Sequence, residues 1–254
     1  MHKIKVASYN ISGGFYVGNE DEEYLDRAAV SSIDNKLLNE IIDTINNEDI
    51  DIICFQEVIT TESVQYIEKI VENTALKNYE YHTLSPCNII ENTDAGLAIL
   101  SKYPIDRTIK DFFPNPNIKF TTASGNTYSM YDKGYMISYI VLDNTHKLTV
   151  FNHHNFPFRR FRSTAKDNMS VFEHFNEVVF GNEPDIVLGD YNTEDFIDLV
   201  PELKNNYIRT IDRITTVDGK NFDEIMLKKD TKYSSKMLKG LSDHYMVMAE
   251  IEIK

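Results

Sequence analysis

Short apolar segments with the alternation of β-strands recur along the chain, and they constrain the fold more than any other feature. They cover residues 3–9, 51–55, 79–84, 96–100, 105–113, 134–142, 147–152, 185–189, 222–227 and 245–252. A short turn at residues 143–146 separates two of these segments, a spacing that predicts a hairpin and therefore antiparallel pairing. This pairing favours sheet packed on sheet over a doubly wound parallel sheet.

Three other segments carry apolar residues at helical spacing. They begin at Val30, Val64 and Met169, and the third is predicted to end at Gly181 as its C-cap. Because helices and strands do not alternate regularly, the predicted fold is an α/β (α+β) four-layer sandwich, with two mixed β-sheets face to face and helices on the outside. Residues 114–127 are predicted to be a long turn-rich loop. Without a linker or repeat in the sequence, we expect residues 1–254 to form a single domain.

The composition excludes several classes of protein. No apolar run approaches the ~20 residues that a membrane-spanning helix needs. Two cysteines are too few for a disulfide framework; Cys54 lies in an apolar run and is predicted to be buried, whereas Cys87 lies in a predicted loop. We therefore expect a cytoplasmic protein without stable membrane insertion or an obligate protein partner. Secretion with a removed signal peptide stays open.

The charges are distributed unevenly. The net charge of −14 opposes non-specific adhesion to DNA or to an anionic membrane. Nevertheless, nine of the 26 lysines and arginines lie in two segments, residues 159–166 and 228–239. An acidic protein with two basic segments favours a locally anionic ligand. Two solvated charged loops are the alternative.

Several of the apolar strands end in polar residues that are costly to bury, the strand 222–227 contains one near its start, and the strand 245–252 is preceded by three. These residues are Asn10, Gln56-Glu57, His153-His154-Asn155, Asp190 with Asn192, Asp223 and Ser242-Asp243-His244. If the ends meet at one edge of the sheets, their burial requires mutual hydrogen bonds or a cation. Oxygen ligands with few histidines and no cysteine suit Mg²⁺. Carboxylate, amide and imidazole groups together supply the water-activating and charge-stabilising roles that phosphoester hydrolysis requires.

Six motifs at these strand ends resemble, in order, those of the endonuclease/exonuclease/phosphatase superfamily. They are SYNISGG, FQEV, AGLAILSKYP, FNHHN, GDYNTED and LSDHY, and the resemblance spans residues 4–252. It implies one catalytic domain that hydrolyses phosphoesters with Mg²⁺, for which Mn²⁺ can substitute. A non-catalytic module on the same fold would be expected to lose some of these motif residues, and none is lost.

The resemblance also implies a metal site. Glu57 matches the family's principal metal carboxylate, and Asn10 matches the amide beside the metal that helps hold the phosphate. Asp243 matches a second carboxylate near the metal.

The catalytic residues follow from the same motifs. Asp190 matches the residue that orients or deprotonates the attacking water, and Asn192 matches a hydrogen-bond donor to the scissile phosphate. His244 matches the imidazole that contacts the phosphoryl oxygen, and Asp223 matches the acid that holds this imidazole. Each of these residues taken alone also has a structural interpretation, such as a turn or a helix cap.

His154 distinguishes the branches of the family. Abasic-site endonucleases carry Tyr at the matching position, whereas members similar to deoxyribonucleases, sphingomyelinases and inositol phosphatases carry His. Asp94 falls where deoxyribonucleases place an acid that pairs with this histidine, although it could be an ordinary loop residue. Asn155 departs from the usual Leu. His153 should point away from His154 on a regular strand, so we assign it no catalysis.

The first basic segment directly follows His154. Its arginines Arg159, Arg160 and Arg162 are interleaved with phenylalanines, a pattern compatible with binding a phosphate-rich strand. Phenylalanines packed inward with arginines outward are the alternative. The favoured substrate is therefore a phosphodiester, with nucleic acid first. The alternative function is a phosphatase or sphingomyelinase-type esterase acting on a small or lipid phosphoester, in which Phe112, Phe113 and the 114–127 loop could meet lipid.

Overall fold

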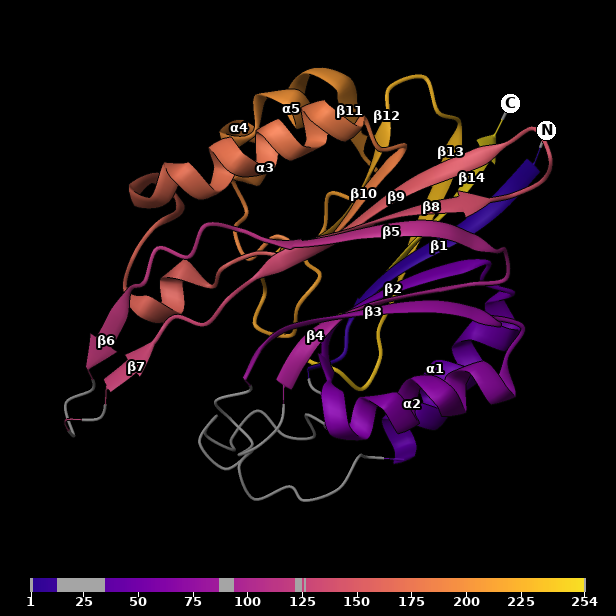
Figure 1. Cartoon of the computed structure of the whole chain (residues 1–254), viewed down its shortest axis with the longest axis horizontal. Helices are drawn as coiled ribbons and strands as arrows, with labels where there is room; N and C mark the ends of the chain where they lie inside the picture. The colour runs from indigo at the N-terminus through magenta and orange to yellow at the C-terminus, as the bar shows by residue number, and fades with distance from the viewer. Residues whose placement is uncertain (1, 13–34, 87–93, 122–124, 126, 254) are drawn as a thin grey trace.

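Two six-stranded sheets form the centre of the molecule (Figure 1). The computed structural model describes residues 2–12, 35–86, 94–121, 125 and 127–253. The first sheet has the order β13-β14-β1-β2-β4-β3, with β1 (His2–Asn10), β2 (Ile52–Ile59), β3 (Asn78–Pro86), β4 (Asp94–Ser101), β13 (Tyr233–Leu238) and β14 (Met246–Ile253). The second has the order β11-β12-β10-β9-β8-β5, with β5 (Ile105–Phe112), β8 (Gly134–Val141), β9 (Lys147–His154), β10 (Ile186–Asp190), β11 (Tyr207–Arg209) and β12 (Asp223–Lys228).

Both sheets are mixed, and helices cover their outer faces. One parallel pair occurs in each sheet, β1 with β2 and β9 with β10, and the other described pairs of the two sheets are antiparallel. The helices α1 (Asn35–Glu48) and α2 (Thr60–Asn73) lie against the first sheet. The helices α3 (Met169–Asn182), α4 (Phe196–Leu199) and α5 (Pro201–Asn206) lie against the second. The predicted four-layer fold is confirmed.

The space between the sheets is filled by aliphatic side chains. They come from alternate positions of the facing strands, among them Ile4 and Val6 of β1, and Leu148 and Val150 of β9. The intervening residues point the other way, toward the helices. This period of two, which is inherent in β-structure, decides which side chains of each strand enter the space between the sheets.

The two outer layers differ in character. Aliphatic residues dominate the contact of α1 and α2 with the first sheet, whereas phenylalanines and tyrosines dominate the contact of α3 with the second. The segment after β9 contributes Phe156, Phe158 and Phe161 to this aromatic layer, and all three are buried. The phenylalanines of the first basic segment therefore pack inward and stabilise the fold.

Some predicted boundaries were wrong. The helix α3 continues through Gly181, and its C-cap is Glu183, which adopts a left-handed conformation with φ 42° and donates its N–H to the Val179 carbonyl. The predicted loop 114–127 contains β6 (Lys119–Thr121), which pairs with β7 (Thr127–Ser129). The strands β11 and β13 and the helix α5 were not predicted. Cys54 is buried as expected, while Val30 and Cys87 lie outside the described residues.

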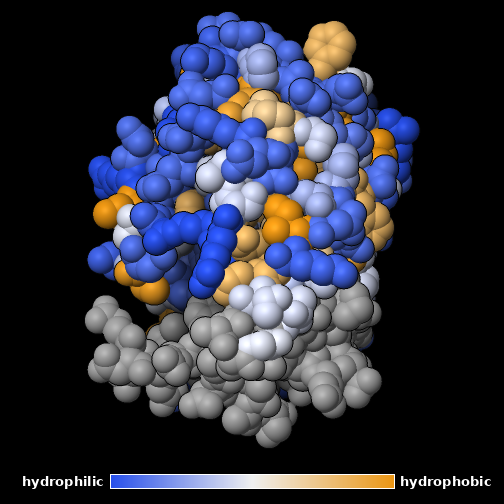
Figure 2. All heavy atoms as spheres, turned by 90° about the vertical axis from the view of Figure 1, so that its left-hand side faces the viewer, coloured by the Kyte–Doolittle hydropathy of each residue, from blue (hydrophilic) through white to orange (hydrophobic). Residues whose placement is uncertain are grey.

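Of the two phenylalanines named in the lipid interpretation, one is exposed and one is buried. Phe113 is buried in the aromatic layer, and only its neighbour Phe112 is exposed, with its ring against His82. The described part of the face that carries β6 and β7 is mainly hydrophilic, with apolar side chains in small separate groups (Figure 2). In the described part of the chain, no helix is long and apolar enough to cross a membrane.

We expect His153 to make the stability depend on pH. Its ring is fully buried against Tyr191 and Phe175, neither ring nitrogen has a hydrogen-bond partner in the described structure, and burial lowers its pKa from 6.5 to about 3. Below pH 6.5 the unfolded chain therefore binds a proton that the folded chain does not, so stability falls as the pH falls toward 3, by up to about 1.4 kcal/mol per pH unit.

The variant His153→Phe should lack this contribution. Urea denaturation between pH 6.5 and 4.5 should show a smaller loss of unfolding free energy in the variant than in the parent. If the larger ring costs a constant amount of unfolding free energy, the plot of unfolding free energy against pH shifts as a whole and its slope does not change. Parallel pH profiles for the two proteins would contradict the prediction.

Candidate functional site

The polar residues at the strand ends lie on the same strand faces as the apolar residues that form the core between the sheets. In β10, Ile186 and Leu188 enter this core, and Asp190 follows two residues later on the same face. The same alternation places the side chains of Asn10, Gln56, Asn152, His154 and Asp223 at the end of this layer. The strand registers align them, because Asn10 pairs with Gln56, and Asp190 pairs with both His154 and Asp223.

Glu57 reaches this layer through an irregularity in β2. Regular alternation would turn its side chain toward the helices, but the register shifts between Phe55 and Val58, and Glu57 has φ 55°. Its Oε1 lies 3.3 Å from the Asn10 Nδ2 and 3.7 Å from the His154 Nε2. A positive φ is uncommon outside glycine, and here it aims the half-buried carboxylate at the polar cluster.

A buried amide pair joins the two sheets directly beside Glu57. The Gln56 Nε2 of the first sheet donates to the Asn152 Oδ1 of the second at 2.8 Å. In return, the Asn152 Nδ2 donates to the carbonyl oxygens of Phe55 at 3.2 Å and Ala98 at 3.0 Å. Both side chains are fully buried. Asn152 therefore holds the backbone of β2 at the irregularity that projects Glu57.

Asp190 is the centre of the hydrogen-bond network. Its Oδ2 accepts from the Asn10 Nδ2 at 3.0 Å and lies 3.3 Å from both the His154 Nε2 and the Asn192 Nδ2, while its Oδ1 accepts from the Asn192 backbone N–H at 2.8 Å. Burial alone would raise the pKa of this carboxyl, but the hydrogen bond from His154 and the neighbouring positive charges hold it well below its usual range.

Gly189 allows the strands to carry Asp190 and His154 so close together. Its φ is +144°, and a Cβ at this position would lie 2.0 Å from the His153 carbonyl oxygen. Only glycine accommodates both the backbone conformation and this approach. The close packing of β10 on β9 thus explains the glycine of the GDYN motif.

Lys133 is a site residue that the sequence analysis missed. It is buried, its Nζ lies 2.9 Å and 2.8 Å from the two ring nitrogens of His154, and it also lies 4.7 Å from the centre of the Tyr131 ring. Burial first, and Lys133 next, lower the pKa of His154. The signal in the sequence is the β8–β9 hairpin, which pairs Gly134 with His154 and so places residue 133 beside the histidine.

His244 and Asp223 form a second pair on the other side of Asp190. The His244 Nδ1 lies 2.7 Å from the Asp223 Oδ2, and Asp223 is fully buried. Burial alone would lower the pKa of His244, but the Asp223 carboxylate raises it well above its ordinary value. With Nδ1 directed at Asp223, the Nε2 is the ring atom left for another ligand.

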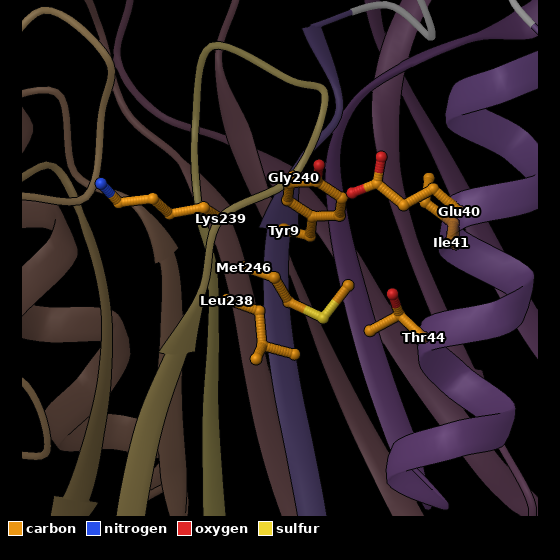
Figure 3. A pocket seen from close by; sticks show the side chains of 8 residues that line it. All are labelled: Tyr9, Glu40, Ile41, Thr44, Leu238, Lys239, Gly240 and Met246. Carbon is orange, nitrogen blue, oxygen red and sulfur yellow. The ribbon is translucent and has the colours of Figure 1, made fainter.

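The loop that carries Asp243 and His244 is fixed on β1 and α1 (Figure 3). The Ser242 N–H donates to the Tyr9 hydroxyl at 3.3 Å, and the Ser242 Oγ donates to the Asn10 carbonyl at 2.8 Å. A Cβ at Gly240 would lie 2.4 Å from the Tyr9 hydroxyl oxygen and 2.6 Å from the Glu40 Oε1. Figure 3 shows the side chains of Tyr9 and Glu40 converging on this glycine. Their close packing positions the loop.

Seven residues predicted from the motifs come together in this site: Asn10, Glu57, His154, Asp190, Asn192, Asp223 and His244. Asp243 is near them, with its Oδ1 accepting from the Ser242 Oγ at 3.3 Å. Two close acid–histidine groups lie at this site, Glu57 with His154 and Asp190, and Asp190 with Asp223 and His244, and Asp243 belongs to neither of them. Asp94 begins β4, and its side chain lies outside the described residues.

The two basic segments differ in their relation to the site. The first segment exposes three arginines, Arg159, Arg160 and Arg162, around a short 3-10 helix, Phe158–Phe161. The positive charge of Arg160 helps to lower the pKa of Glu57. Arg162 lies over the Phe120 ring, 4.4 Å from its centre. The segment is adjacent to the site, as expected from its position after His154.

Most of the second basic segment is directed elsewhere. Lys228 pairs with Asp185 at 3.2 Å, Lys232 lies 4.0 Å from Glu252, and Lys236 pairs with Glu48. Lys228 is also five residues along β12 from Asp223, about 17 Å. These three lysines therefore have carboxylate neighbours away from the site.

The donor set fits a divalent cation. Burial alone would raise the pKa of Glu57, but neighbouring positive groups, His154 first and Lys133 next, hold it at about 2. Glu57 and Asp190 are therefore both ionised at neutral pH. Two carboxylates within one close group are what a hard dication requires, and Glu57 is open to solvent, with 30% of its side chain exposed.

Comparison with known families and structures agrees with this geometry. The model of the endonuclease/exonuclease/phosphatase family matches residues 7–244. A protein of this family from Beutenbergia cavernae superposes with a TM-score of 0.75 at 12% identity, over 100% of this chain and 72% of that one. The human nocturnin catalytic domain gives 0.66 at 15% identity, covering 99% and 94%. These structural likenesses support the fold alone.

One relative is similar in sequence as well. The inositol phosphosphingolipids phospholipase C of Saccharomyces cerevisiae is 30% identical over 162 residues, which are 60% of this chain. The match covers 32% of the yeast protein, so the matched part of this chain corresponds to about a third of its length.

We expect the cross-sheet amide pair to contribute strongly to stability. In Gln56→Met the Asn152 Oδ1 stays buried without its donor, which should cost about 1–3 kcal/mol of unfolding free energy in urea denaturation. Ser8→Ala is the matched control, because the Ser8 Oγ accepts from the same Gln56 Nε2, but at 3.3 Å and within one sheet. Equal losses in the two variants would contradict a special role for the bond between the sheets.

Proposed function

We propose that this chain, which belongs to the endonuclease/exonuclease/phosphatase family of phosphoester hydrolases, is a Mg²⁺-dependent phosphodiesterase of the phospholipase C type. Its substrate would be a phosphodiester with a small or lipid-linked headgroup. The observation that carries the proposal is the compact cluster in which the Glu57 and Asp190 carboxylates lie beside His154 and Lys133. Such a cluster suits one phosphate group.

In this proposal Glu57 is the principal ligand of the cation, with Asp190 in the same close group. The Asn10 Oδ1 accepts from the Ser12 N–H, which leaves the Asn10 Nδ2 to face the carboxylates. This Nδ2 donates to both Glu57 and Asp190 and so bridges them. Asp243 as a further ligand stays a prediction. When bound, Mg²⁺ supplies polarisation of a phosphoryl oxygen. Mn²⁺ should substitute, because it accepts the same oxygen donors.

Asp190 and Asn192 would position the attacking water. The low pKa of Asp190 keeps its carboxylate ionised, so it is a poor proton acceptor at rest, but it can accept a hydrogen bond from a water molecule held in line with the phosphorus. The Asn192 Nδ2, now shared between Asp190 and the Asn155 carbonyl, is the amide donor for a phosphoryl oxygen.

Two side chains, Lys133 and His244, would stabilise the charge that develops on the phosphate. Lys133 supplies a buried ammonium beside His154, and His244 directs its Nε2 away from Asp223. Donors that are fixed before the reaction need no reorganisation in the transition state, which is the main source of electrostatic catalysis. In a phospholipase C reaction, water adds to phosphorus and the bond to the lipid alcohol oxygen breaks, which releases the phosphorylated headgroup.

The size of the positive region favours a small headgroup over a long polyanion. Lys228, Lys232 and Lys236 lie beside carboxylates away from the site, which argues against a phosphate track that runs from it along this segment. The sequence relative, by its name, acts on inositol phosphosphingolipids. Nucleic acid is the second candidate, and the exposed Arg159, Arg160 and Arg162 beside the site are the observation in its favour.

A substrate panel distinguishes these candidates. The purified chain should release phosphorylated headgroup from inositol phosphosphingolipid or sphingomyelin vesicles with Mg²⁺ or Mn²⁺, and not with a chelator. Plasmid, oligonucleotide and a soluble phosphomonoester should react far more slowly. Faster cleavage of DNA or RNA than of every lipid would reject the phospholipase proposal and favour the nuclease. Full activity with chelator would reject the role of the cation.

Glu57→Gln should retain the fold and lose the activity. The substitution keeps the shape of the side chain but removes its charge, so we expect Mg²⁺ affinity to weaken by at least about tenfold and turnover to fall steeply. Mg²⁺ dependence of the hydrolysis rate measures both effects. Glu80→Gln is the control and should behave as the parent. It removes the charge of a half-buried carboxylate of β3 that pairs with Lys110 of β5. Unchanged metal dependence in Glu57→Gln would remove Glu57 from the site.

A further inference from the structure

A second group of potential metal ligands lies at the opposite end of the sheets. His2 begins β1, and Asp143 and His146 belong to the turn between β8 and β9. The His2 Nε2 lies 2.6 Å from the Asp143 Oδ2, and the His146 Nδ1 lies 3.0 Å from the same oxygen. One ligand atom of each residue lies within 4.8 Å of the others. In Figure 1 the N-terminus and this turn lie next to each other.

The turn itself orients the carboxylate. The Asp143 Oδ1 accepts from the backbone N–H groups of Thr145 at 2.7 Å and His146 at 2.9 Å, and from the Thr145 Oγ1 at 2.8 Å. These bonds occupy one carboxylate oxygen and fix the side chain. The other oxygen, Oδ2, lies close to both imidazoles. The His146 Nδ1 also lies 2.9 Å from Oδ1 and 2.8 Å from the Thr145 Oγ1. Hydrogen bonds that hold a ligand in place in this way are typical of built metal sites.

The donor set selects the kind of ion. Two imidazole nitrogens and one carboxylate oxygen suit Zn²⁺ and related transition metals, whereas Mg²⁺ and Ca²⁺ prefer oxygen ligands alone. Tetrahedral Zn²⁺ holds its nitrogen and oxygen ligands about 3.3 Å apart. The present separations of 2.6 and 3.0 Å must therefore open by a few tenths of an ångström. Side chains that are about a third exposed can make this adjustment.

We propose that His2, Asp143 and His146 form a Zn²⁺-class binding site that ties the two sheets together. The His2 Nε2, the Asp143 Oδ2 and the His146 Nδ1 are the ligands, and water completes the coordination. The site joins the start of β1 in the first sheet to the β8–β9 turn in the second. It is eight residues along β1 from Asn10, about 26 Å, so it does not take part in hydrolysis.

The test separates this site from the one at Glu57. In a Glu57→Gln/Asp190→Asn background, which disables the other carboxylate group, calorimetric titration with Zn²⁺ should still show one site. Adding His2→Ala, His146→Ala or Asp143→Asn should each weaken Zn²⁺ binding at least tenfold. Asp106→Asn is the matched control, because it removes an exposed carboxylate paired with Lys147 near the same turn, and it should change nothing.

Two more measurements, Co²⁺ absorption and thermal unfolding with Zn²⁺, test the same site independently of calorimetry. Co²⁺ in place of Zn²⁺ should give visible absorption typical of a nitrogen–oxygen site, and the His146→Ala variant should lack it. Zn²⁺ should raise the melting temperature of the background protein but not that of its Asp143→Asn derivative, which keeps an acceptor for the turn. Zn²⁺ affinity that is unaffected by all three substitutions, or no binding at millimolar Zn²⁺, would overturn the proposal. Neither result would bear on the hydrolase.

Discussion

The hydrogen bond from Gln56 to Asn152 crosses between the two sheets at the point where their facing surfaces change from aliphatic to polar. A buried amide is costly unless its partners are in place, so this bond allows few relative positions of β2 and β9. Glu57 follows Gln56, and His154 lies two residues beyond Asn152. The bond therefore fixes the distance between the first sheet's carboxylate and the second sheet's imidazole, on which the geometry of the site depends.

The candidate site is the polar end of the core between the sheets. Along β10 the same face reads Ile186, Leu188, Asp190, and the adjacent strands repeat this change from aliphatic to polar. The apolar part supplies the free energy of packing, and the polar part is held at a fixed position by it. This arrangement explains why buried carboxylates and imidazoles are tolerated here, since each of them bonds to another member of the cluster or lies close to it.

The alternation of the strands and the motifs at their ends were enough to predict the two-sheet fold and the residues that gather around Asp190. Features that depend on local geometry could not be predicted from the sequence. Lys133 is a single lysine whose position beside His154 depends on the register of the β8–β9 hairpin. The positive φ of Glu57 depends on a strand irregularity that no residue type signals. Nor does the sequence show that Lys228 and Lys236 of the second basic segment pair with Asp185 and Glu48, which are distant along the chain.

The central claim is that Glu57, projected from the irregularity in β2, holds a divalent cation at the end of the core between the sheets. Anomalous diffraction from crystals soaked in Mn²⁺ tests it most directly. The account predicts a peak within about 2.5 Å of a Glu57 carboxylate oxygen, in the group that Glu57 forms with Asp190 and His154. Crystals with full Mn²⁺ occupancy elsewhere on the chain and no peak at Glu57 would contradict it.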